Sequence, residues 1–363
     1  MKGKKIALVG FRLNEGGADR VMANLSNFFH DQGFEVHVII FHDSIGYPYS
    51  GKVFNLGKLK SQKNDFLNKV KRFYHLKKYI KQYEFDHIID FRFRINLLQE
   101  LMISKWIYKN KAIYTVHSSK LDVYMPNNSF LTRMIYSKSR AMISITRAMQ
   151  QLIIDKHGLN NIINIYNPID VSKIDIMAKE KVGLDFEYII AAGEFDKDTK
   201  QFDKLIRMYS RSKLPEKEVA LVIIGRGEKE NYLKSIINEL KLNDHVHLIG
   251  FQGNPYKYFA KAKFLVLTSL FEGLPMVLLE SLAAGTPVIA WDCPTGPSEI
   301  IEHENNGLLI ENQNEDKFIE AMNTFLINDQ LYQNCKRHTV DSIKKFDLEQ
   351  IGREWLQLLN NDQ

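Results

Sequence analysis

Short runs of apolar residues alternate along the first half of the chain with segments whose apolar residues recur every three or four positions. The runs have the length of β-strands and occupy residues 5–11, 35–41, 85–91, 112–117, 141–146 and 161–169. Several of them are continuously apolar, which is typical of a parallel sheet covered on both faces. Helical spacing fills most of the intervals, for example at residues 95–108 and 147–156. This pattern predicts a Rossmann-like, doubly wound α/β domain.

A second series of the same kind follows a polar stretch, residues 171–184, which we interpret as the crossing between two domains. Its strand-length runs occupy residues 188–195, 219–225, 246–251, 264–269 and 287–292. The chain then ends in an amphipathic helical pattern, 346–359, with Ile351, Trp355 and Leu358 on one stripe. A length of 363 residues suits two domains. We therefore expect two Rossmann-like parallel-sheet domains.

The segment 264–311 carries the most informative spacing in the chain. An apolar strand is followed by Glu272 in a short loop, and Pro275 then opens a helix, where its missing N–H costs nothing. Glu280 lies five residues into that helix, about 8 Å along its axis. The helix N-terminus between the two carboxylates offers backbone amides to an anion. This layout suits a ligand with hydroxyl groups at both ends and phosphate in the middle, which is the shape of a nucleotide-sugar.

Residues 272–280, EGLPMVLLE, resemble the E-x7-E motif of the retaining glycosyltransferases of family 4, which have the GT-B fold. Residues 292–309, DCPTGPSEII…NGLL, are similar to members that extend bacterial surface glycans on lipid-linked carriers. An isolated E-x7-E would more simply be an amphipathic helix with two solvated acids, but the strand, loop, helix, strand context favours the resemblance. The resemblance implies an acceptor-side domain 1–170, a donor-binding domain 171–345, a cleft between them, and a helix 346–363 that crosses back onto the first domain.

The resemblance also assigns roles to residues of the second domain. In this family the first Glu and the amides after it hold the donor sugar, and here these are Glu272, Gly273 and Leu274. The second Glu, Glu280, would hold the ribose. Lys200 stands before QFDKLI as the family lysine does, and would hold the donor phosphates in place of a metal. The usual arginine is replaced by Glu194, and the sequence leaves open whether Lys197 or Arg20 takes over its role.

Two weaker signals lie in the same domain. Gly225 begins GRGEKE, which matches the Gly-x-Gly-Glu turn of the family but is short and weak by itself. Phe251 lies where the family places its base-binding segment, so its backbone is expected to meet the uracil. An ordinary core aromatic is an equally good interpretation of Phe251.

In the first domain, the candidate residues follow two strands. Gly16 and Gly17 lie between the first strand and the first helix, and NEGGADRVM looks like the glycine-rich first loop of the family, which faces the donor diphosphate. A plain tight turn is the alternative. His117 ends a strand before Ser118 and Ser119, at the edge where open α/β sheets bind ligands. A lone histidine in a strand is usually structural, but in this family a histidine at the matching place contacts the donor sugar, so His117 is the catalytic candidate here.

Charge separates the two halves of the chain. Residues 1–170 hold 26 Lys and Arg against 13 Asp and Glu, whereas the remainder holds 23 against 30. This asymmetry indicates different partners for the two halves. No nucleic-acid recognition motif stands out, so an anionic membrane surface or a pyrophosphate-linked acceptor is favoured.

Residues 60–81 hold much of the excess positive charge of the first half. They contain eight Lys or Arg around Phe66, Val70, Phe73 and Ile80, which lie at helical spacing, as in an interfacial helix. The plainer interpretation is a surface helix packed on its own sheet.

The remaining features restrict the cellular setting. The cysteines, Cys293 and Cys335, indicate no disulfide framework and so favour a reducing cytoplasm. No apolar run reaches the ~18 residues of a spanning helix, and no signal-like stretch precedes the first strand. We identify no His-x-x-x-His, no Cys-x-x-Cys and no Asp-x-Asp after a strand, so no cofactor or metal is expected. We expect a cytoplasmic protein, peripheral at most on the inner face of the membrane.

The sequence thus predicts a retaining, metal-independent hexosyltransferase that uses a nucleotide-sugar, with UDP favoured, and a saccharide or lipid-linked saccharide acceptor. Two rivals remain open. A sugar-nucleotide 2-epimerase would share the architecture but would need acids around the second carbon of the sugar. A noncatalytic partner subunit of a transferase is supported by the Glu194 replacement alone.

Overall fold

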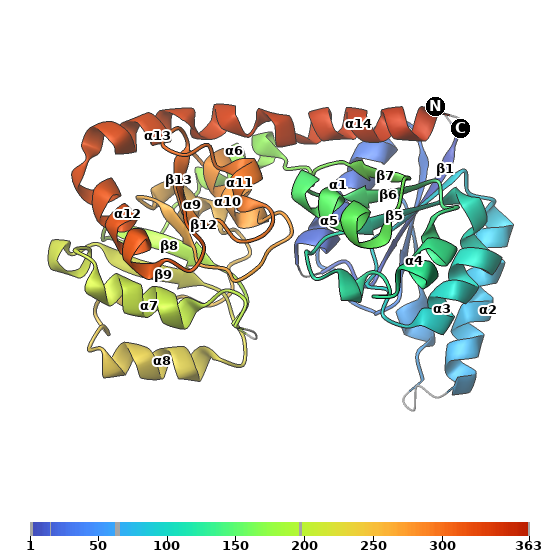
Figure 1. Cartoon of the computed structure of the whole chain (residues 1–363), viewed down its shortest axis with the longest axis horizontal. Coiled ribbons are helices and arrows are strands. Elements are labelled where there is room, and N and C mark those ends of the chain that lie inside the picture. Colours follow the sequence, from blue (N-terminus) through green and yellow to red (C-terminus); the bar gives the residue numbers. More distant parts are fainter. Residues whose placement is uncertain (1–2, 15, 62–65, 196–197, 362–363) are drawn as a thin grey trace. The chain divides into compact units, whose positions relative to one another are not determined.

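The computed structural model of the chain describes residues 3–14, 16–61, 66–195 and 198–361, and it divides into two compact units (Figure 1). Unit 1 contains Met1–Pro168 and Leu348–Gln363, and unit 2 contains Ile169–Asp347. Each unit is built on one parallel sheet, so the predicted pair of Rossmann-like domains is confirmed. None of the helices among these described residues is long and apolar enough to cross a membrane.

The sheet of unit 1 has seven strands in the order β3-β2-β1-β4-β5-β6-β7. Its strands are β1 (Lys5–Gly10), β2 (Glu35–Ile40), β3 (Lys52–Asn55), β4 (His87–Asp90), β5 (Ala112–Val116), β6 (Ala141–Ser144) and β7 (Ile162–Asn164). Its longer helices are α1 (Gly17–Asp31), α2 (Phe66–Tyr83), α3 (Leu97–Met102), α4 (Ser129–Tyr136), α5 (Arg147–His157) and α14 (Leu348–Asn360). Short helical segments are η1 (Leu56–Leu59), the π-helical η2 (Ile103–Tyr108), η3 (Lys109–Lys111) and η4 (Leu121–Val123).

The core of unit 1 lies where α1 and α14 cover the central strands. β1 is buried over Ile6–Gly10, since it pairs with β2 on one side and β4 on the other. Trp355 of α14 meets Phe29 of α1 edge to face, with ring centroids 6.4 Å apart. Gly352 allows this approach, because a Cβ there would lie 2.2 Å from Cζ of Phe28. The predicted stripe of the last helix therefore packs into unit 1.

Two elements of unit 1 differ from the sequence-based expectation. Strand β3 was not predicted, because its four residues are only partly buried and carry no continuous apolar run. The predicted helix 95–108 is divided into α3 and η2. The π-helical segment has only 6 residues, too few for its wider turn to show in the apolar pattern.

The sheet of unit 2 has six strands in the order β10-β9-β8-β11-β12-β13. Its strands are β8 (Tyr188–Ala192), β9 (Ala220–Ile224), β10 (Val246–Leu248), β11 (Leu265–Leu267), β12 (Val288–Trp291) and β13 (Gly307–Ile310). Its helices are α6 (Val171–Ala178), α7 (Phe202–Arg211), α8 (Glu230–Glu239), α9 (Tyr256–Lys261), α10 (Met276–Ala283), α11 (Pro297–Ile300), α12 (Glu315–Ile327) and α13 (Asp329–Ser342). Two 3-10 segments, η5 (Pro215–Lys217) and η6 (Lys344–Phe346), complete it.

Helix α6 corrects the interpretation of residues 171–184 as an interdomain crossing. Asp170 caps this helix by accepting a hydrogen bond from the Lys173 amide at 2.9 Å. The helix buries Ile174 and packs on α9 and α10, all within unit 2. The chain instead passes between the units at Pro168 and Ile169, and again at Asp347 and Leu348.

Candidate active site

The strand order of each sheet reverses once, and this reversal marks where a ligand is expected. In unit 2 the reversal lies between β8 and β11, because the chain continues outward from β8 to β9 and β10 on one side and from β11 to β12 and β13 on the other. Loops that leave adjacent parallel strands in opposite directions open a crevice at the carboxyl edge of the sheet. Lys200 follows β8 and Glu272 follows β11, so both predicted residues lie at this point.

Lys200 and Glu272 form an ion pair at the reversal. Lys200 Nζ lies 2.6 Å from Glu272 Oε1, and the two side chains are 22% and 13% exposed. The backbones of their loops are joined as well, since Thr268 Oγ1 donates to the carbonyl of Lys200 at 2.8 Å and the Leu270 amide donates to the carbonyl of Thr199 at 2.8 Å. The site therefore presents one cation for an anionic group and one carboxylate for hydroxyl groups side by side.

A turn after β12 supports the Glu272 loop. Thr295 is fully buried, and its Oγ1 donates to the carbonyl of Glu272 at 2.5 Å. Gly296 has φ +100°, and a Cβ there would lie 2.5 Å from the carbonyl oxygen of Gly273 and 2.5 Å from Cδ of Pro275. Only glycine permits this close approach at that backbone angle. Sequence analysis gave no role to Thr295 or Gly296, although both lie in the stretch that carries the family resemblance.

Helix α10 begins at Met276, one residue later than predicted, with Pro275 in the capping position. Among the described residues no side chain caps this helix, so backbone amides of its first turn are left for another acceptor. Gly273 and Leu274, which follow Glu272 in the same loop, are buried. Glu280 is also buried, at 7% exposure, on the second turn of the helix. A helix N-terminus of this kind attracts negative charge, as proposed for the donor phosphates.

Glycines line the carboxyl ends of the neighbouring strands. The Gly193 amide donates to the carbonyl of Ile224 at 2.9 Å, and the Gly225 amide donates to that of Gly250 at 3.0 Å. A Cβ on Gly225 would lie 1.9 Å from the carbonyl oxygen of Gly193, so the two loops touch through their backbones. The stem of Lys200 lies directly over Gly193. Gly225 is thus required by packing, whatever it contributes to a ligand.

Phe251 is 60% exposed and is not a core aromatic. The guanidinium of Arg226 lies 4.9 Å from the centre of its ring, and Arg226 is exposed as well. Sequence analysis assigned no role to Arg226, although GRGE placed it after a strand. Glu194, which stands in place of the family arginine, is exposed. Of the two substitutes considered, Lys197 lies outside the described residues, and Arg20 belongs to unit 1, where it lies over the ring of Tyr47.

The loop after β8 corrects the expectation that no Asp-x-Asp sequence follows a strand. Residues 196–198 read Asp-Lys-Asp, a spacing that some glycosyl-transfer sites use for a metal ion. Asp198 is paired with Lys229. The first two members of the triplet lie outside the described residues, so a test for metal dependence is needed.

In unit 1 the reversal lies between β1 and β4, and Gly16 and Gly17 lead from β1 into α1. Gly16 has φ +84°, a conformation that favours glycine, with open space where a Cβ would stand. Asp19, in the first turn of α1, pairs with Arg12 at 3.4 Å. The glycine loop is therefore shaped by its backbone angle rather than by crowding.

His117 lies at the end of β5, stacked on Phe91 with ring centroids 5.6 Å apart. Beneath it is buried Arg94, whose guanidinium donates to the carbonyls of Tyr124 and Thr115 at 3.0 Å each. Arg92 nearby is held between Asp90 at 2.7 Å and Glu100 at 3.1 Å, so its charge is used internally. Burial, and then the Arg94 cation, lower the pKa of His117 to about 3.

The hydrogen bonds around His117 select one tautomer. Thr115 Oγ1 donates its only proton to the carbonyl of Asp90 at 3.0 Å. It must therefore accept the proton of His117 Nε2, which lies 2.9 Å away. The remaining ring nitrogen, Nδ1, is then an acceptor, and it is buried without a partner among the described residues. A neutral His117 would offer an acceptor to a hydroxyl group rather than a charge to a phosphate.

We expect His117 to remain neutral as the pH falls from 8 to 5. Its pKa is lowered in the folded state, so the unfolded chain binds a proton below about pH 6.5 while the folded protein does not. Stability should therefore fall as the pH drops below that value, and be retained above it. Imidazole nitrogen NMR should report an Nε2–H ring with no titration in this range. Thr115→Val should disturb the tautomer, whereas Thr115→Ser should preserve it. Titration of His117 near its ordinary pKa would contradict the assignment.

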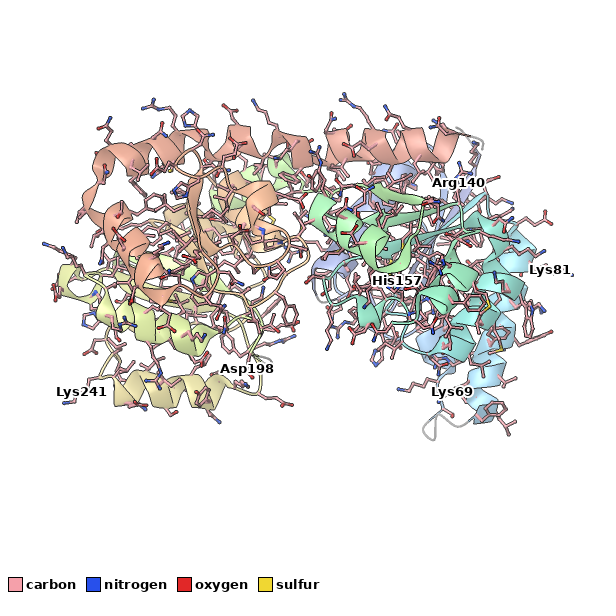
Figure 2. The ribbon with its side chains drawn as sticks, viewed as in Figure 1. Lys69, Lys81, Arg140, His157, Asp198 and Lys241 are labelled. Carbon is pink, nitrogen blue, oxygen red and sulfur yellow. The ribbon has the colours of Figure 1, made fainter. Side chains whose placement is uncertain are left out.

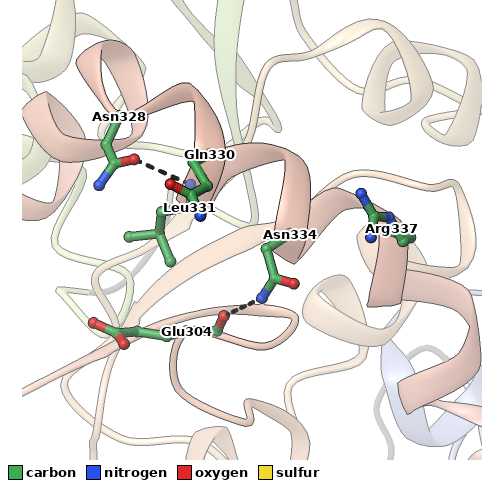
Figure 3. Close-up of a pocket in the computed structure, with 6 residues that line it drawn as sticks. All are labelled: Glu304, Asn328, Gln330, Leu331, Asn334 and Arg337. Atoms are coloured by element: carbon green, nitrogen blue, oxygen red, sulfur yellow. Dashed lines mark hydrogen bonds between the residues drawn. The ribbon is translucent and has the colours of Figure 1, made fainter.

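A separate hollow on unit 2 lies between α12, α13 and the turn before β13 (Figure 3). Its lining includes Glu304, Leu331 and Arg337, and Asn334 Nδ2 donates to the carbonyl of Glu304 at 2.8 Å. None of the residues predicted to hold the donor lines this hollow. It is not part of the candidate site.

Comparison with known proteins covers both units. Residues 15–173 match the family described as Glycosyltransferase Family 4, and residues 172–340 match Glycosyl transferases group 1. The chain is 31% identical, over 98% of its length and 99% of the relative's, to the N-acetylgalactosamine-N,N'-diacetylbacillosaminyl-diphospho-undecaprenol 4-alpha-N-acetylgalactosaminyltransferase of Campylobacter jejuni. A second transferase of that organism, which acts on a GalNAc-containing diNAcBac-PP-undecaprenol, is 24% identical over 98% of each chain. The structure of Anabaena HepE with UDP and glucose aligns with a TM-score of 0.80 at 18% identity, over 99% of this chain and 100% of that one.

Proposed function

We propose, from the premise that this chain belongs to the glycosyltransferases of family 4, that it is a retaining, metal-independent hexosyltransferase. Its donor would be a UDP-linked hexose or N-acetylhexosamine. Its acceptor would be a saccharide carried on a lipid pyrophosphate, in the biosynthesis of a surface glycan. The observation that carries this proposal is the Lys200–Glu272 ion pair at the strand reversal of unit 2.

Each part of the donor would contact residues of unit 2 that suit its charge and hydrogen-bonding groups. The diphosphate would take the Lys200 ammonium and the amides at the start of α10, which together supply the positive potential that such a group needs. Glu272 would accept hydroxyl protons of the sugar, and buried Glu280 those of the ribose. The uracil would lie toward Phe251, at the carboxyl end of β10. The UDP bound by Anabaena HepE supports a UDP donor, and the nucleotide remains part of the proposal.

The chemical step would be a displacement on one face of the sugar. The bond between the anomeric carbon and the β-phosphate oxygen breaks, and the acceptor oxygen bonds to the same face. The acceptor proton passes to the departing phosphate, so atoms and charge balance without a second nucleophile. Negative charge grows on that phosphate, where Lys200 and the α10 amides would stabilise it most in the transition state. His117, neutral with Nδ1 as an acceptor, would orient a sugar hydroxyl.

The acceptor assignment rests on the relatives and on charge. Both transferases of Campylobacter jejuni act on undecaprenol-linked saccharides by their names. Unit 1 carries the basic excess of the sequence, as a partner for pyrophosphate or anionic lipid requires. We place the enzyme in the cytoplasm, peripheral on the inner face of the membrane, where such acceptors are extended.

A panel of nucleotide-sugars tests the donor assignment. One UDP-sugar should raise the melting temperature of the purified chain, because a ligand that binds only the native state stabilises it. Transfer from that donor should continue in EDTA, since Lys200 and the α10 amides would replace a metal. Strict dependence on Mn²⁺ or Mg²⁺ would overturn the metal-free mechanism and point to residues 196–198. Conversion of the UDP-sugar alone into its epimer would favour the 2-epimerase, and a chain that binds no donor would favour the noncatalytic subunit.

A further inference from the structure

Gln201, the residue between Lys200 and helix α7, has an unusual backbone conformation. Its φ is +47° and its ψ is 43°, in the left-handed region that residues other than glycine seldom occupy. A residue that precedes a helix is ordinarily extended, and its side chain often caps the first turn. Gln201 is not extended, and its side chain makes no capping hydrogen bond to the described residues of α7. A contact outside the helix must therefore hold it in this conformation.

Most other left-handed residues in the described chain lie where that conformation is common. Four of them come within two residues after a helical segment, where a left-handed residue is a frequent ending: Glu84, Lys109, Glu218 and Lys241. Gln313 does not follow a helix. It has φ +61° in the turn between β13 and α12, and its side chain contacts that of Gln201.

The side-chain amides of Gln201 and Gln313 bond to each other. Gln313 Nε2 donates to Gln201 Oε1 at 2.8 Å, and Gln201 Nε2 donates to Gln313 Oε1 at 3.2 Å. Lys204, in the first turn of α7, donates from Nζ to the same Gln313 oxygen at 2.8 Å. With its oxygen and nitrogen exchanged, the Gln201 amide donates to the carbonyl of Thr268 at 3.1 Å and still lies against Gln313. Two residues with uncommon backbone angles are thus held against each other.

The glutamine pair connects two loops at the carboxyl edge of the sheet. Gln201 follows β8 and Gln313 follows β13, with β11 and β12 between these strands. Asp198, labelled in Figure 2, lies in the same loop as Gln201, and its carbonyl accepts from the Gln201 amide at 3.3 Å. Thr268 Oγ1 holds the carbonyl of Lys200 at 2.8 Å. Lys200 is therefore held directly by the β11 loop and, through its neighbour Gln201, by the β13 loop.

Other contacts already join α7 to α12. The two helices pack against each other, and Arg211 at the end of α7 pairs with Glu315 at 3.2 Å and with Asp316 at 2.5 Å. A pair of glutamines is therefore not needed to keep these helices together. What the pair adds is the backbone conformation of the residue next to Lys200.

We propose that Gln201 and Gln313 are positioning residues, which together direct Lys200 toward the donor diphosphate. The left-handed turn at Gln201 changes the chain direction directly after Lys200, so Lys200 stays at the carboxyl edge of the sheet while α7 leads away from it. The Gln313 amide favours this turn over the extended conformation. Lys200 then meets Glu272 at 2.6 Å before a donor binds. This inference rests on the proposed function for its donor, but the hold on Lys200 is measured without one.

Chemical labelling tests the hold on Lys200 in the absence of a donor. Lys200 is ion-paired and 22% exposed, so it should react slowly with acetic anhydride. Gln201→Gly removes the amide, and glycine adopts left-handed and extended conformations about equally readily. Acetylation of Lys200, measured by mass spectrometry against exposed Lys213, should then become about fivefold faster or more, because the loop opens more often. Gln313→Gly should have the same effect from a different loop. Equal acetylation of Lys200 in all chains would overturn the proposal.

Turnover shows whether the pair acts through Lys200. With a saturating UDP-sugar, Gln201→Gly and Gln313→Gly should each lower kcat about tenfold, because a loosened ammonium meets the departing phosphate less often in the right geometry. The double variant should lose no more than the worse single variant, since both substitutions remove one contact. In the Lys200→Ala chain, Gln201→Gly should cause no further loss. A full tenfold loss in that chain would mean that the pair does not act through Lys200.

Lys241→Gly is the matched control for a glycine at a left-handed position. Lys241, also labelled in Figure 2, has φ +57° and is exposed, and it precedes β10, so it lies at the opposite edge of the sheet. This variant should leave kcat and the acetylation of Lys200 unchanged, without lowering the melting temperature.

Two further outcomes separate the inference from the proposed function. Glycine variants of the pair that lower only the melting temperature, with kcat unchanged, would show a purely structural contact and overturn the positioning role. An unaltered chain that uses no UDP-sugar would refute the proposed function. The acetylation of Lys200 would still decide whether the two glutamines hold it.

Discussion

Glu272→Ala is expected to abolish sugar transfer while leaving the affinity for UDP nearly unchanged. Its carboxylate is held by Lys200 at 2.6 Å and its carbonyl by Thr295 at 2.5 Å, so the side chain is oriented before any donor arrives. A preorganised group that contacts the reacting sugar raises kcat by a factor of about 10²–10³. UDP lacks the sugar, so its affinity should not depend on the Glu272 side chain. Transfer assays and calorimetry with UDP measure the two quantities separately.

Glu280→Ala is the matched control for this substitution. It removes a carboxylate eight residues further along, buried in the second turn of α10. If it holds the ribose, UDP binding should weaken by about 1–3 kcal/mol, the cost of a lost buried hydrogen-bond partner. Equal losses of UDP affinity in the two variants would refute the division of the donor between them.

Lys200→Ala should reduce turnover by about 10²–10³, with a smaller effect on donor binding, because its ammonium would stabilise the charge that grows on the leaving phosphate. The substitution also leaves Glu272 without its cation, close to where the diphosphate would lie. Combined with Glu272→Ala, the loss should therefore be less than the sum of the two in free energy. Single-turnover rates at saturating donor measure the chemical step. A rise in KM with an unchanged rate would assign Lys200 to binding alone.

Much of the fold was predictable because the buried strands are continuous apolar runs. Strands β1, β5 and β9 fall inside their predicted ranges. Both faces of these strands are buried, so their residues are almost all apolar and stand out in the sequence. Strand β3 was missed because an edge strand needs no such run. Helix α6 was missed because only Ile174 is buried, so its sequence resembles a polar linker.

The candidate site was predictable only where local sequence carries the information. The two carboxylates of the α10 region share one segment, so their spacing was visible in the sequence. The contact between Lys200 and Glu272 was not, because 72 positions separate them and only the strand order brings their loops together. The exposure of Phe251 was equally hidden, since an aromatic residue after a strand is buried or exposed according to which loops cover it. The contact of Arg226 with the Phe251 ring was hidden for the same reason.

The return of α14 to unit 1 has a consequence for how the chain matures during translation. Ile351, Trp355 and Leu359 belong to the core of unit 1, although the rest of that unit ends at Pro168. Unit 2 is complete once Asp347 has emerged from the ribosome, whereas unit 1 lacks part of its core until the last helix is released. The half that is synthesised first is therefore finished last. Until then α14 does not cover Phe28 and Phe29 of α1, and we expect this exposed apolar surface to favour aggregation of the incomplete chain.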